Sequence, residues 1–148
     1  EASDLLASTV IKCKKLVEYL KKKYPENDIT KRLVKGFNPK KIKETLPTSE
    51  HTAYSENKGE KIAFCLNKYK HNDLKLIDKN TLMFVALHEL THVGTKEIGH
   101  PKQYWINFKY ILEKAEEIDI YKPVDYDKKP QKYCGMTISD NPYFDLKD

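Results

Sequence analysis

Apolar residues recur every three or four positions in three segments of the chain, and this spacing predicts three amphipathic helices. The first helix is capped by Ser3 or Asp4 and ends at Pro25, and its apolar stripe is Leu6, Val10, Cys13, Val17, Leu20 and Tyr24. The second runs from Asp78 or Asn80 to about Val93, and its apolar side is Leu82, Val85, Ala86, Leu90 and Val93. The third begins at Pro101 and carries Tyr104, Phe108, Ile111, Leu112, Ala115 and Ile118.

Other patterns predict shorter elements. A helix over about residues 29–35 should end at Gly36 in the left-handed conformation, and residues 37–52 should form a loop with one strand. Residues 52–66 resemble a β-hairpin, because Glu56-Asn57-Lys58-Gly59 suits a turn and Ile62, Phe64 and Leu66 alternate with Ala63 and Cys65. A further short strand is expected over residues 133–138. Helices and short strands mixed in this way predict an α+β fold.

The composition fits a globular protein. The chain has 148 residues, of which 39% are apolar and 33% charged, with 5 Gly and 7 Pro. These proportions exclude collagen-like, linker-like and wholly disordered chains. Charged residues interrupt every apolar run before the roughly 18–20 residues that a membrane helix needs, so no membrane span is expected within this segment.

We expect a single domain over residues 1–148. Residues 1–44 would form its basic, helical part, and residues 45–148 would hold the sheet, the second long helix and the C-terminal part. Because the chain begins at Glu1 and not at Met, we expect it to be a processed or excised product.

The net charge of +5 is concentrated near the N-terminus. Residues 1–44 hold 12 Lys and Arg against 6 Asp and Glu, whereas residues 45–148 hold 15 against 16. The basic residues include Lys12, Lys14, Lys15, Lys21, Lys22, Lys23, Lys31 and Arg32. Such a surplus can attract nucleic acid or an acidic partner, although solvated lysines on a helix face are the commoner explanation.

Three cysteines, Cys13, Cys65 and Cys134, form neither a CxxC pair nor an even set. A disulfide framework is therefore not expected, and a reducing, intracellular location in the cytoplasm or nucleus is. Cys13 lies in the apolar stripe of the first helix and should be a core residue.

The residues His88-Glu89-Leu90-Thr91-His92 lie within the second long helix. Residues four apart share one face of a helix, so two imidazoles can converge on one metal ion. This is the HExxH arrangement of zinc enzymes, in which zinc lowers the pKa of a water molecule to roughly 7 and Glu89 would act as the general base. The pattern predicts hydrolysis of an amide bond. The alternative is a polar helix face with two ordinary histidines.

A catalytic zinc needs a third protein ligand, and His100 is the preferred candidate. Gly94 and Gly99 let the chain leave the helix and turn back, and Pro101 opens the next helix, so His100 should face the first two ligands. The alternative for His100 is a capping or surface role.

Other ligand patterns are less favoured. A thermolysin-like carboxylate from the following helix is the rival third ligand, but the acidic residues there are expected to form a solvated face: Glu113, Glu116 and Glu117. His51 and His71 are expected in polar loops. The astacin and matrix-metalloprotease pattern is excluded, because it requires Gly and His where this chain has Thr95 and Ile98.

The stretch from Leu82 to Leu112 resembles the WLM and SprT-like (Spartan) metalloproteases. It shares with them the HExxH motif and the later Gly99-His100-Pro101-Lys102-Gln103-Tyr104-Trp105, although the spacing between His92 and His100 differs from that of typical members. The segment Tyr133-Cys134-Gly135-Met136-Thr137-Ile138 is similar to WLM-like peptidases of large DNA viruses. The resemblance implies a zincin-like fold, in which a small mixed or antiparallel sheet packs on the HExxH helix.

The same resemblance implies zinc-dependent proteolysis, often of proteins crosslinked to DNA. Zinc would be the cofactor, a protein or peptide the substrate, and DNA a partner of the basic N-terminal region. A viral member would act inside the host cell. The alternative function is a non-catalytic DNA- or protein-binding module whose zinc only stabilises the fold, but the intact Glu89 and an open fourth ligand position argue against it.

Three further residues are candidates for supporting roles. Tyr133 would stabilise the oxyanion if its strand borders the cleft, and a structural role is the alternative. Cys134 is expected to be a buried strand thiol or, alternatively, a fourth zinc ligand. Trp105 is expected to pack behind the site.

Overall fold

The computed structural model describes residues 2–45, 53–56, 61–69 and 72–146. Its helices are α1 (Ala2–Lys23), α2 (Asp28–Gly36), α3 (Lys79–Gly94), α4 (Lys102–Glu117) and α5 (Pro142–Asp145), with a 3-10 turn at Pro39–Lys41. Its strands are β1 (Ile42–Thr45), β2 (Ala53–Glu56), β3 (Lys61–Cys65), β4 (Asn67–Tyr69), β5 (Asn72–Leu76), β6 (Gln131–Tyr133) and β7 (Met136–Ile138). This mixture of helices and small sheets confirms the α+β prediction.

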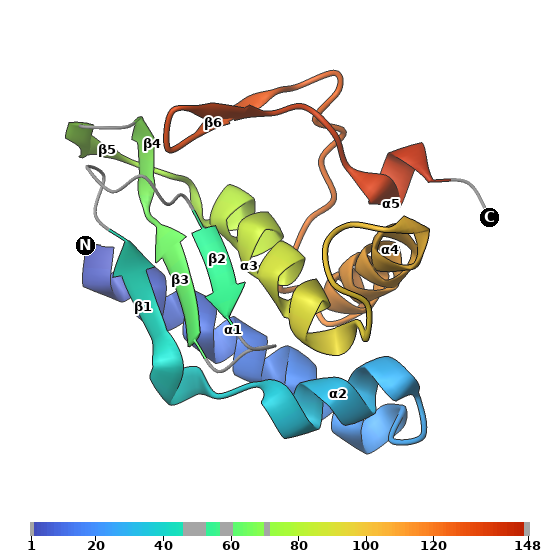
Figure 1. Ribbon diagram of the computed structural model, residues 1–148. Helices are drawn as coiled ribbons and strands as arrows, with labels where there is room; N and C mark the ends of the chain where they lie inside the picture. Colours follow the sequence, from blue (N-terminus) through green and yellow to red (C-terminus); the bar gives the residue numbers. More distant parts are fainter. Residues whose placement is uncertain (1, 46–52, 57–60, 70–71, 147–148) are drawn as a thin grey trace.

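Helix α3 runs through the middle of the molecule, between the sheet and α4 (Figure 1). Helices α1, α2 and α4 and strands β2 and β3 all pack against it. The prediction of a one-sided apolar stripe was therefore too narrow, because Met83, Phe84 and Leu87 are buried as well. A helix with so broad an apolar surface needs neighbours around most of it, and the surrounding elements provide them.

Strand β3 is the middle strand of a mixed sheet with the order β1-β3-β2. It pairs in parallel with β1, with Ile42 opposite Ile62, and antiparallel with β2, with Ala53 opposite Phe64. The β2–β3 pairing confirms the predicted hairpin, whose turn at residues 57–60 lies outside the described residues, as do His51 and His71. The alternation of large and small residues over 62–66 predicts one buried face, but every residue from Ile62 to Leu66 is buried, so that expectation was wrong. The sequence of a strand that is covered on both faces is a continuous apolar run.

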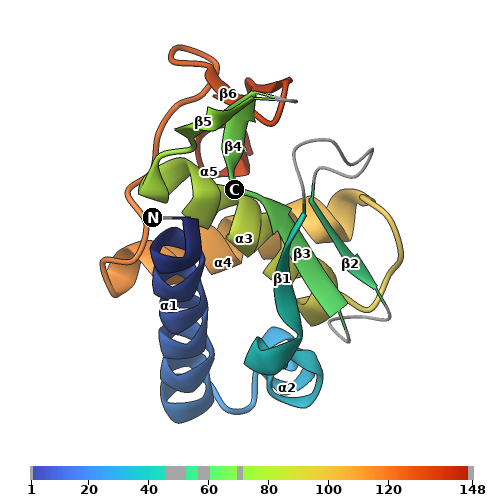
Figure 2. The same ribbon diagram turned by 90° about the vertical axis from the view of Figure 1, so that its left-hand side faces the viewer.

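Two details of the N-terminal helices differ from the prediction. The buried residues of α1 form a stripe rotated from the expected one: Leu5, Thr9, Cys13, Leu16, Val17 and Leu20. Helix α2 ends at Gly36, but Gly36 is not left-handed, because the chain leaves the helix through an extended Phe37 whose N–H donates to the carbonyl of Leu33. Figure 2 shows α1 beside the sheet and α2 under the lower end of the sheet, next to the lower end of α1, with β4, β5 and β6 at the opposite end.

The structure has two hairpins where the sequence predicted a loop and a single strand. Strands β4 and β5 pair antiparallel, and neither was predicted, because residues such as Asn, Asp and Lys have low strand propensity. The single strand expected over residues 133–138 is instead the β6–β7 hairpin, with Tyr133 opposite Met136. Its turn residues Cys134 and Gly135 have φ of 49° and 81°, the positive values that a type I′ hairpin turn requires.

A disulfide joins Cys65, at the end of β3, to Cys134 in the β6–β7 turn, with their Cα atoms 6.2 Å apart. The expectation of no disulfide was wrong, and so were both roles considered for Cys134, a strand thiol and a zinc ligand. The bond spans 69 residues, and only the fold brings the two cysteines into reach. Cys13 has a free, buried thiol, and burial raises its pKa to about 12.

Opening this disulfide should lower the free energy of unfolding by about 2–4 kcal/mol, because the bond restricts the unfolded chain over a long loop. Guanidinium denaturation with and without dithiothreitol measures the difference. The Cys134→Ser variant should match the reduced protein and should not respond to the reductant. Equal stability of the oxidised and reduced wild type would contradict this prediction.

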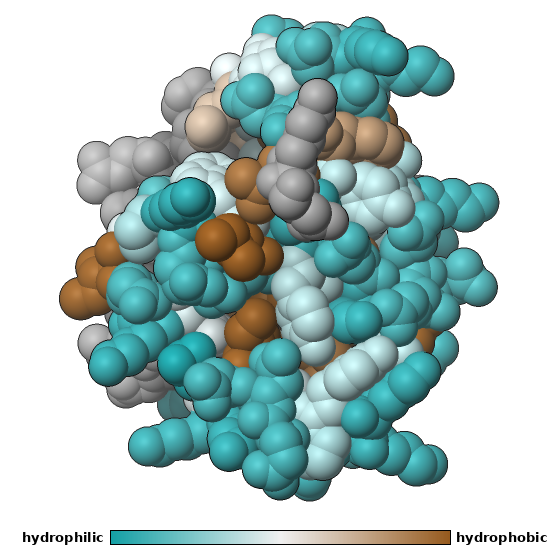
Figure 3. Space-filling model, turned by 90° about the vertical axis from the view of Figure 1, so that its right-hand side faces the viewer, coloured by the Kyte–Doolittle hydropathy of each residue, from teal (hydrophilic) through white to brown (hydrophobic). Residues whose placement is uncertain are grey.

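One face of the molecule is drawn with its side chains in Figure 3. Figure 3 shows a face that is mainly hydrophilic, on which hydrophobic residues appear as small, separate patches. In the described part of the chain, no helix has the length and apolarity that crossing a membrane requires.

Candidate metal centre

Helix α3 carries the first two histidines, and both of its ends are held. At its start, the Asp78 carboxylate accepts a hydrogen bond from the backbone N–H of Thr81 at 2.9 Å, which confirms Asp78 as the cap. At its end, the Arg32 guanidinium donates to the carbonyl of Gly94 at 3.1 Å. A positive charge at a helix C-terminus is stabilising, so Arg32 helps to hold the last turn, which carries His92.

A short loop brings the third histidine back to α3. Gly94 ends the helix close to α2, where an added Cβ would lie 2.9 Å from the side chain of Ile29. Gly99 has a φ of +83°, the left-handed conformation that lets the chain turn. His100 and then Pro101, the N-cap residue of α4, follow directly. The predicted reversal of the chain at Gly99 is therefore present.

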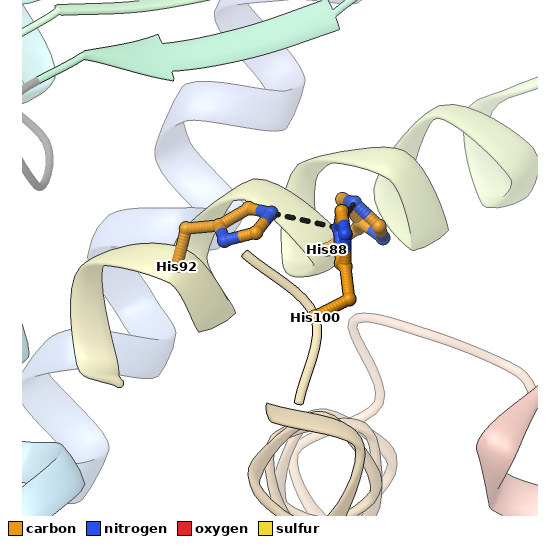
Figure 4. A group of neighbouring side chains, drawn as sticks. All are labelled: His88, His92 and His100. Atoms are coloured by element: carbon orange, nitrogen blue, oxygen red, sulfur yellow. Dashed lines mark hydrogen bonds between the residues drawn. The ribbon is translucent and has the colours of Figure 1, made fainter. Parts of the chain in front are cut away.

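The three imidazoles point toward one another (Figure 4). Nε2 of His100 lies 3.1 Å from Nε2 of His92 and 3.3 Å from Nε2 of His88. Nitrogens that bind zinc tetrahedrally at 2.0–2.1 Å lie about 3.3–3.4 Å apart, so these separations fit one ion with little adjustment. Three histidines thus lie close enough together to hold a metal ion.

The protonation state of His88 suits a ligand. Burial, together with the neighbouring His92 and His100, lowers the pKa of His88 to about 3. The imidazole is therefore neutral at physiological pH, the form that binds metals. His100 is exposed, so the group of histidines is open to solvent on one side.

Glu89 lies beside the group, as the HExxH spacing predicts. Its carboxylate Oε2 is 3.9 Å from Nε2 of His88, and only 5% of the residue is exposed. Burial raises the pKa of Glu89 to about 8, and a cation held by the histidines would favour the charged form again. The carboxyl group is thus placed where proton exchange near neutral pH is favoured.

Tyr104 also contributes to the candidate site, although the sequence predicted it only as part of the apolar stripe of its helix. It is fully buried, and its ring centroid lies 4.6 Å from that of His92, 4.8 Å from that of His100 and 5.4 Å from that of His88. Its hydroxyl donates to the carbonyl of His88 at 2.8 Å. The signal in the sequence is the spacing of four between His100 and Tyr104 at the start of a helix.

Trp105 lies behind His100, as expected. Its ring stacks on the imidazole at 5.7 Å, and its Nε1 donates to the carbonyl of His100 at 3.1 Å. A second anchor of the loop is a buried polar pair, in which the Asn107 amide donates to the Thr95 hydroxyl at 3.0 Å. Both contacts tie the segment around His100 to α4, so the third histidine is oriented from outside α3.

The rival carboxylates are not part of the group. The Glu116 carboxylate accepts a hydrogen bond from the Tyr143 hydroxyl at 2.6 Å, and Glu117 accepts from the Tyr19 hydroxyl at 2.7 Å. Glu113 is exposed on α4. The structure therefore brings His100 to the HExxH pair and leaves these three acids on the surface of α4.

Tyr133 borders the same region. It is buried, and it lines a small pocket that His88 and Glu89 also line. Burial raises the pKa of Tyr133, and the charge of Glu89 adds to this effect, whereas a backbone hydrogen bond from Cys65 opposes it. Its strand thus adjoins the site, and its oxyanion role stays a prediction.

The basic residues near the N-terminus are of two kinds. Lys14, Lys15, Lys21, Lys22 and Lys23 are exposed on α1. Arg32 is half-buried and donates to the carbonyl at the end of α3, so it also has a structural role. Whether the lysines of α1 bind DNA stays a prediction.

The chain gives no match to a protein-family model and none to a solved structure. Two proteins of invertebrate iridescent viruses match short segments. Uncharacterized protein 136R of Invertebrate iridescent virus 6 is 35% identical over 75 residues, which cover 49% of this chain and 40% of that protein. Uncharacterized protein 042R of Invertebrate iridescent virus 3 is 41% identical over 61 residues, which cover 40% and 36%.

A third viral protein is similar over nearly the whole chain. Uncharacterized protein R325 of Acanthamoeba polyphaga mimivirus is 30% identical over 145 residues, which cover 95% of this chain and 73% of that protein. The chain therefore belongs to the same family as the mimivirus protein R325.

Proposed function

We propose that this protein is a zinc-dependent endopeptidase, with His88, His92 and His100 as metal ligands and Glu89 as the general base. The observation that carries the proposal is the convergence of three imidazole Nε2 atoms, 3.1 and 3.3 Å apart, next to a buried carboxylate. Three histidines with an open side are typical of catalytic zinc sites, whereas structural sites are usually closed by four ligands and often include Cys.

Zinc, when bound, supplies a Lewis acid that makes hydroxide available at neutral pH. The protein's own groups do the rest. Glu89 accepts a proton from the attacking water and delivers it to the amine that leaves. Tyr104 and Trp105 hold the His88 and His100 segments in place through hydrogen bonds to their backbone carbonyls. The pocket beside Glu89 gives the peptide a place to bind next to these groups.

We extend the proposal to the fold and the substrate class. The packing of α3 under a mixed sheet, whose strand β2 is antiparallel to β3, supports a zincin-like domain of the WLM and SprT-like kind. The exposed lysines of α1 favour substrates that are bound to DNA. A filter-binding titration at low salt that shows no affinity for DNA would remove the DNA part of the proposal.

Removing the metal should abolish peptide hydrolysis. Lewis-acid catalysis is worth several kcal/mol, and each 1.4 kcal/mol is tenfold in rate, so we expect a loss of at least about 100-fold. The rate of peptide cleavage, followed by mass spectrometry, should fall on treatment with 1,10-phenanthroline and return with about one zinc per chain. Zinc-loaded protein that cleaves no peptide would favour the alternative, a binding module with a structural metal.

A further inference from the structure

A small apolar pocket lies between α3 and the β6–β7 hairpin. Its volume is about 190 Å³. Phe84, Val85, His88 and Glu89 line it from α3. Tyr133, Met136 and Ile138 line it from the hairpin. The pocket therefore adjoins the candidate metal centre on the side of the general base.

The hairpin presents an apolar face to this pocket. In its register Tyr133 lies opposite Met136 and Gln131 opposite Ile138, which puts the three pocket residues on one face. Lys132 and Thr137 lie on the other face, are exposed, and are joined by a hydrogen bond of 2.8 Å. The hairpin is thus amphipathic, and its apolar side faces the HExxH helix.

The hairpin is fixed in place, so the pocket exists before any substrate binds. The disulfide ties Cys134 to β3. The backbone N–H of Cys134 donates to the carbonyl of Asn67 at 2.8 Å, and that of Gly135 donates to Lys68 at 3.2 Å. A pre-formed pocket costs little ordering free energy on binding.

The size and lining of the pocket indicate its ligand. Pockets for drug-sized molecules measure about 300–1,000 Å³, so this one has room for a single side chain. Phe84, Val85, Met136 and Ile138 favour an apolar group and disfavour a charged one, because a charge would lose its hydration in this lining.

We propose that this pocket receives one apolar side chain of the peptide substrate, next to the bond that is cleaved, and that Met136 controls what enters. This inference rests on the proposed endopeptidase function. Met136, the first residue of β7, is 55% exposed, so it forms the rim of the pocket and is accessible from solvent. The substrate class is then proteins or peptides with a residue such as Leu, Met or Phe next to the bond that is cleaved.

Peptides that are identical except at one position test this inference. The zinc-loaded protein should cleave a Leu peptide with a kcat/KM at least about 10-fold above that of the Ala peptide, because each methylene in an apolar pocket is worth roughly 10–200-fold. The Asp peptide should be the poorest substrate. Equal kcat/KM values for the Leu and Asp peptides would overturn the inference and leave the proposed endopeptidase function standing.

Variants of Met136 test whether this pocket causes the preference for the Leu peptide. Met136→Glu should reduce cleavage of the Leu peptide at least about 10-fold and raise that of a Lys peptide, whereas Met136→Leu should keep the preference for Leu over Lys. Ile11→Glu is the matched control, because Ile11 is 56% exposed on α1, and it should leave all rates unchanged. An unchanged preference in Met136→Glu would overturn the assignment of this pocket.

A binding measurement separates the two proposals. Calorimetric titration of the zinc-loaded Glu89→Gln variant should show tighter binding of the Leu peptide than of the Asp peptide. If wild type cleaves no peptide and this difference in affinity is present, the endopeptidase proposal fails and the pocket assignment stands. Equal affinities would overturn the pocket assignment.

Discussion

Replacing His100 by alanine should weaken zinc binding by more than about 100-fold. Loss of a hydrogen-bonding partner behind a ligand already costs roughly 10–100-fold in metal affinity, and loss of a ligand costs more. His88 and His92 would remain on α3, but two imidazoles cannot replace three. Competition with a chromophoric chelator measures the affinity, and circular dichroism checks that the variant is folded.

The control for His100→Ala is Glu113→Ala, which removes an exposed carboxylate from α4 and should bind zinc as wild type does. The wild type should hold about one zinc per chain. If His100→Ala bound zinc normally and Glu113, Glu116 or Glu117 proved to be coordinated, the assignment of the third ligand would be wrong.

The Glu89→Gln variant should keep the fold and the zinc but lose peptide hydrolysis. An amide cannot accept the proton of water at neutral pH, and general-base catalysis contributes about 10²–10⁴-fold. Because Glu89 is buried, the neutral amide should not lower the free energy of unfolding. Steady-state cleavage rates, zinc content and thermal unfolding together check the three parts of this expectation.

Glu113→Gln is the matched control for Glu89→Gln, since it makes the same chemical change at an exposed position. It should leave the rate of cleavage unchanged. A Glu89→Gln variant that cleaves peptides at the wild-type rate would rule out Glu89 as the general base. A variant that loses zinc as well would show that Glu89 supports the metal centre itself.

The helices were predictable because their signals are local. Residues three and four apart lie on one face of a helix, so α3 and α4 and the convergence of His88 with His92 follow from spacing alone. The burial of most of α3 did not follow, since it depends on the elements that pack around it. The rotation of the buried stripe on α1 has the same cause.

The strands and cysteines were less predictable. Strand β4 is polar in sequence, and the turn of the β6–β7 hairpin donates hydrogen bonds to its carbonyls, a contact that no local pattern encodes. Counting three cysteines argued against a disulfide, yet Cys65 and Cys134 are bonded and Cys13 is free in the core. An odd number of cysteines implies only that at least one of them is outside any disulfide within the chain.

The sequence by itself determined the HExxH helix, its neighbouring carboxylate and the loop with Gly99 that returns His100, because each depends on residues close together in the chain. The tertiary structure decided the rest. It placed Arg32 on the end of α3, 62 residues away, and it joined Cys65 to Cys134 across 69 residues. Tyr133 and Met136 form a pocket beside Glu89 for the same reason. Contacts between distant segments arise from packing of the whole chain, so they cannot be predicted from the periodicity of one segment.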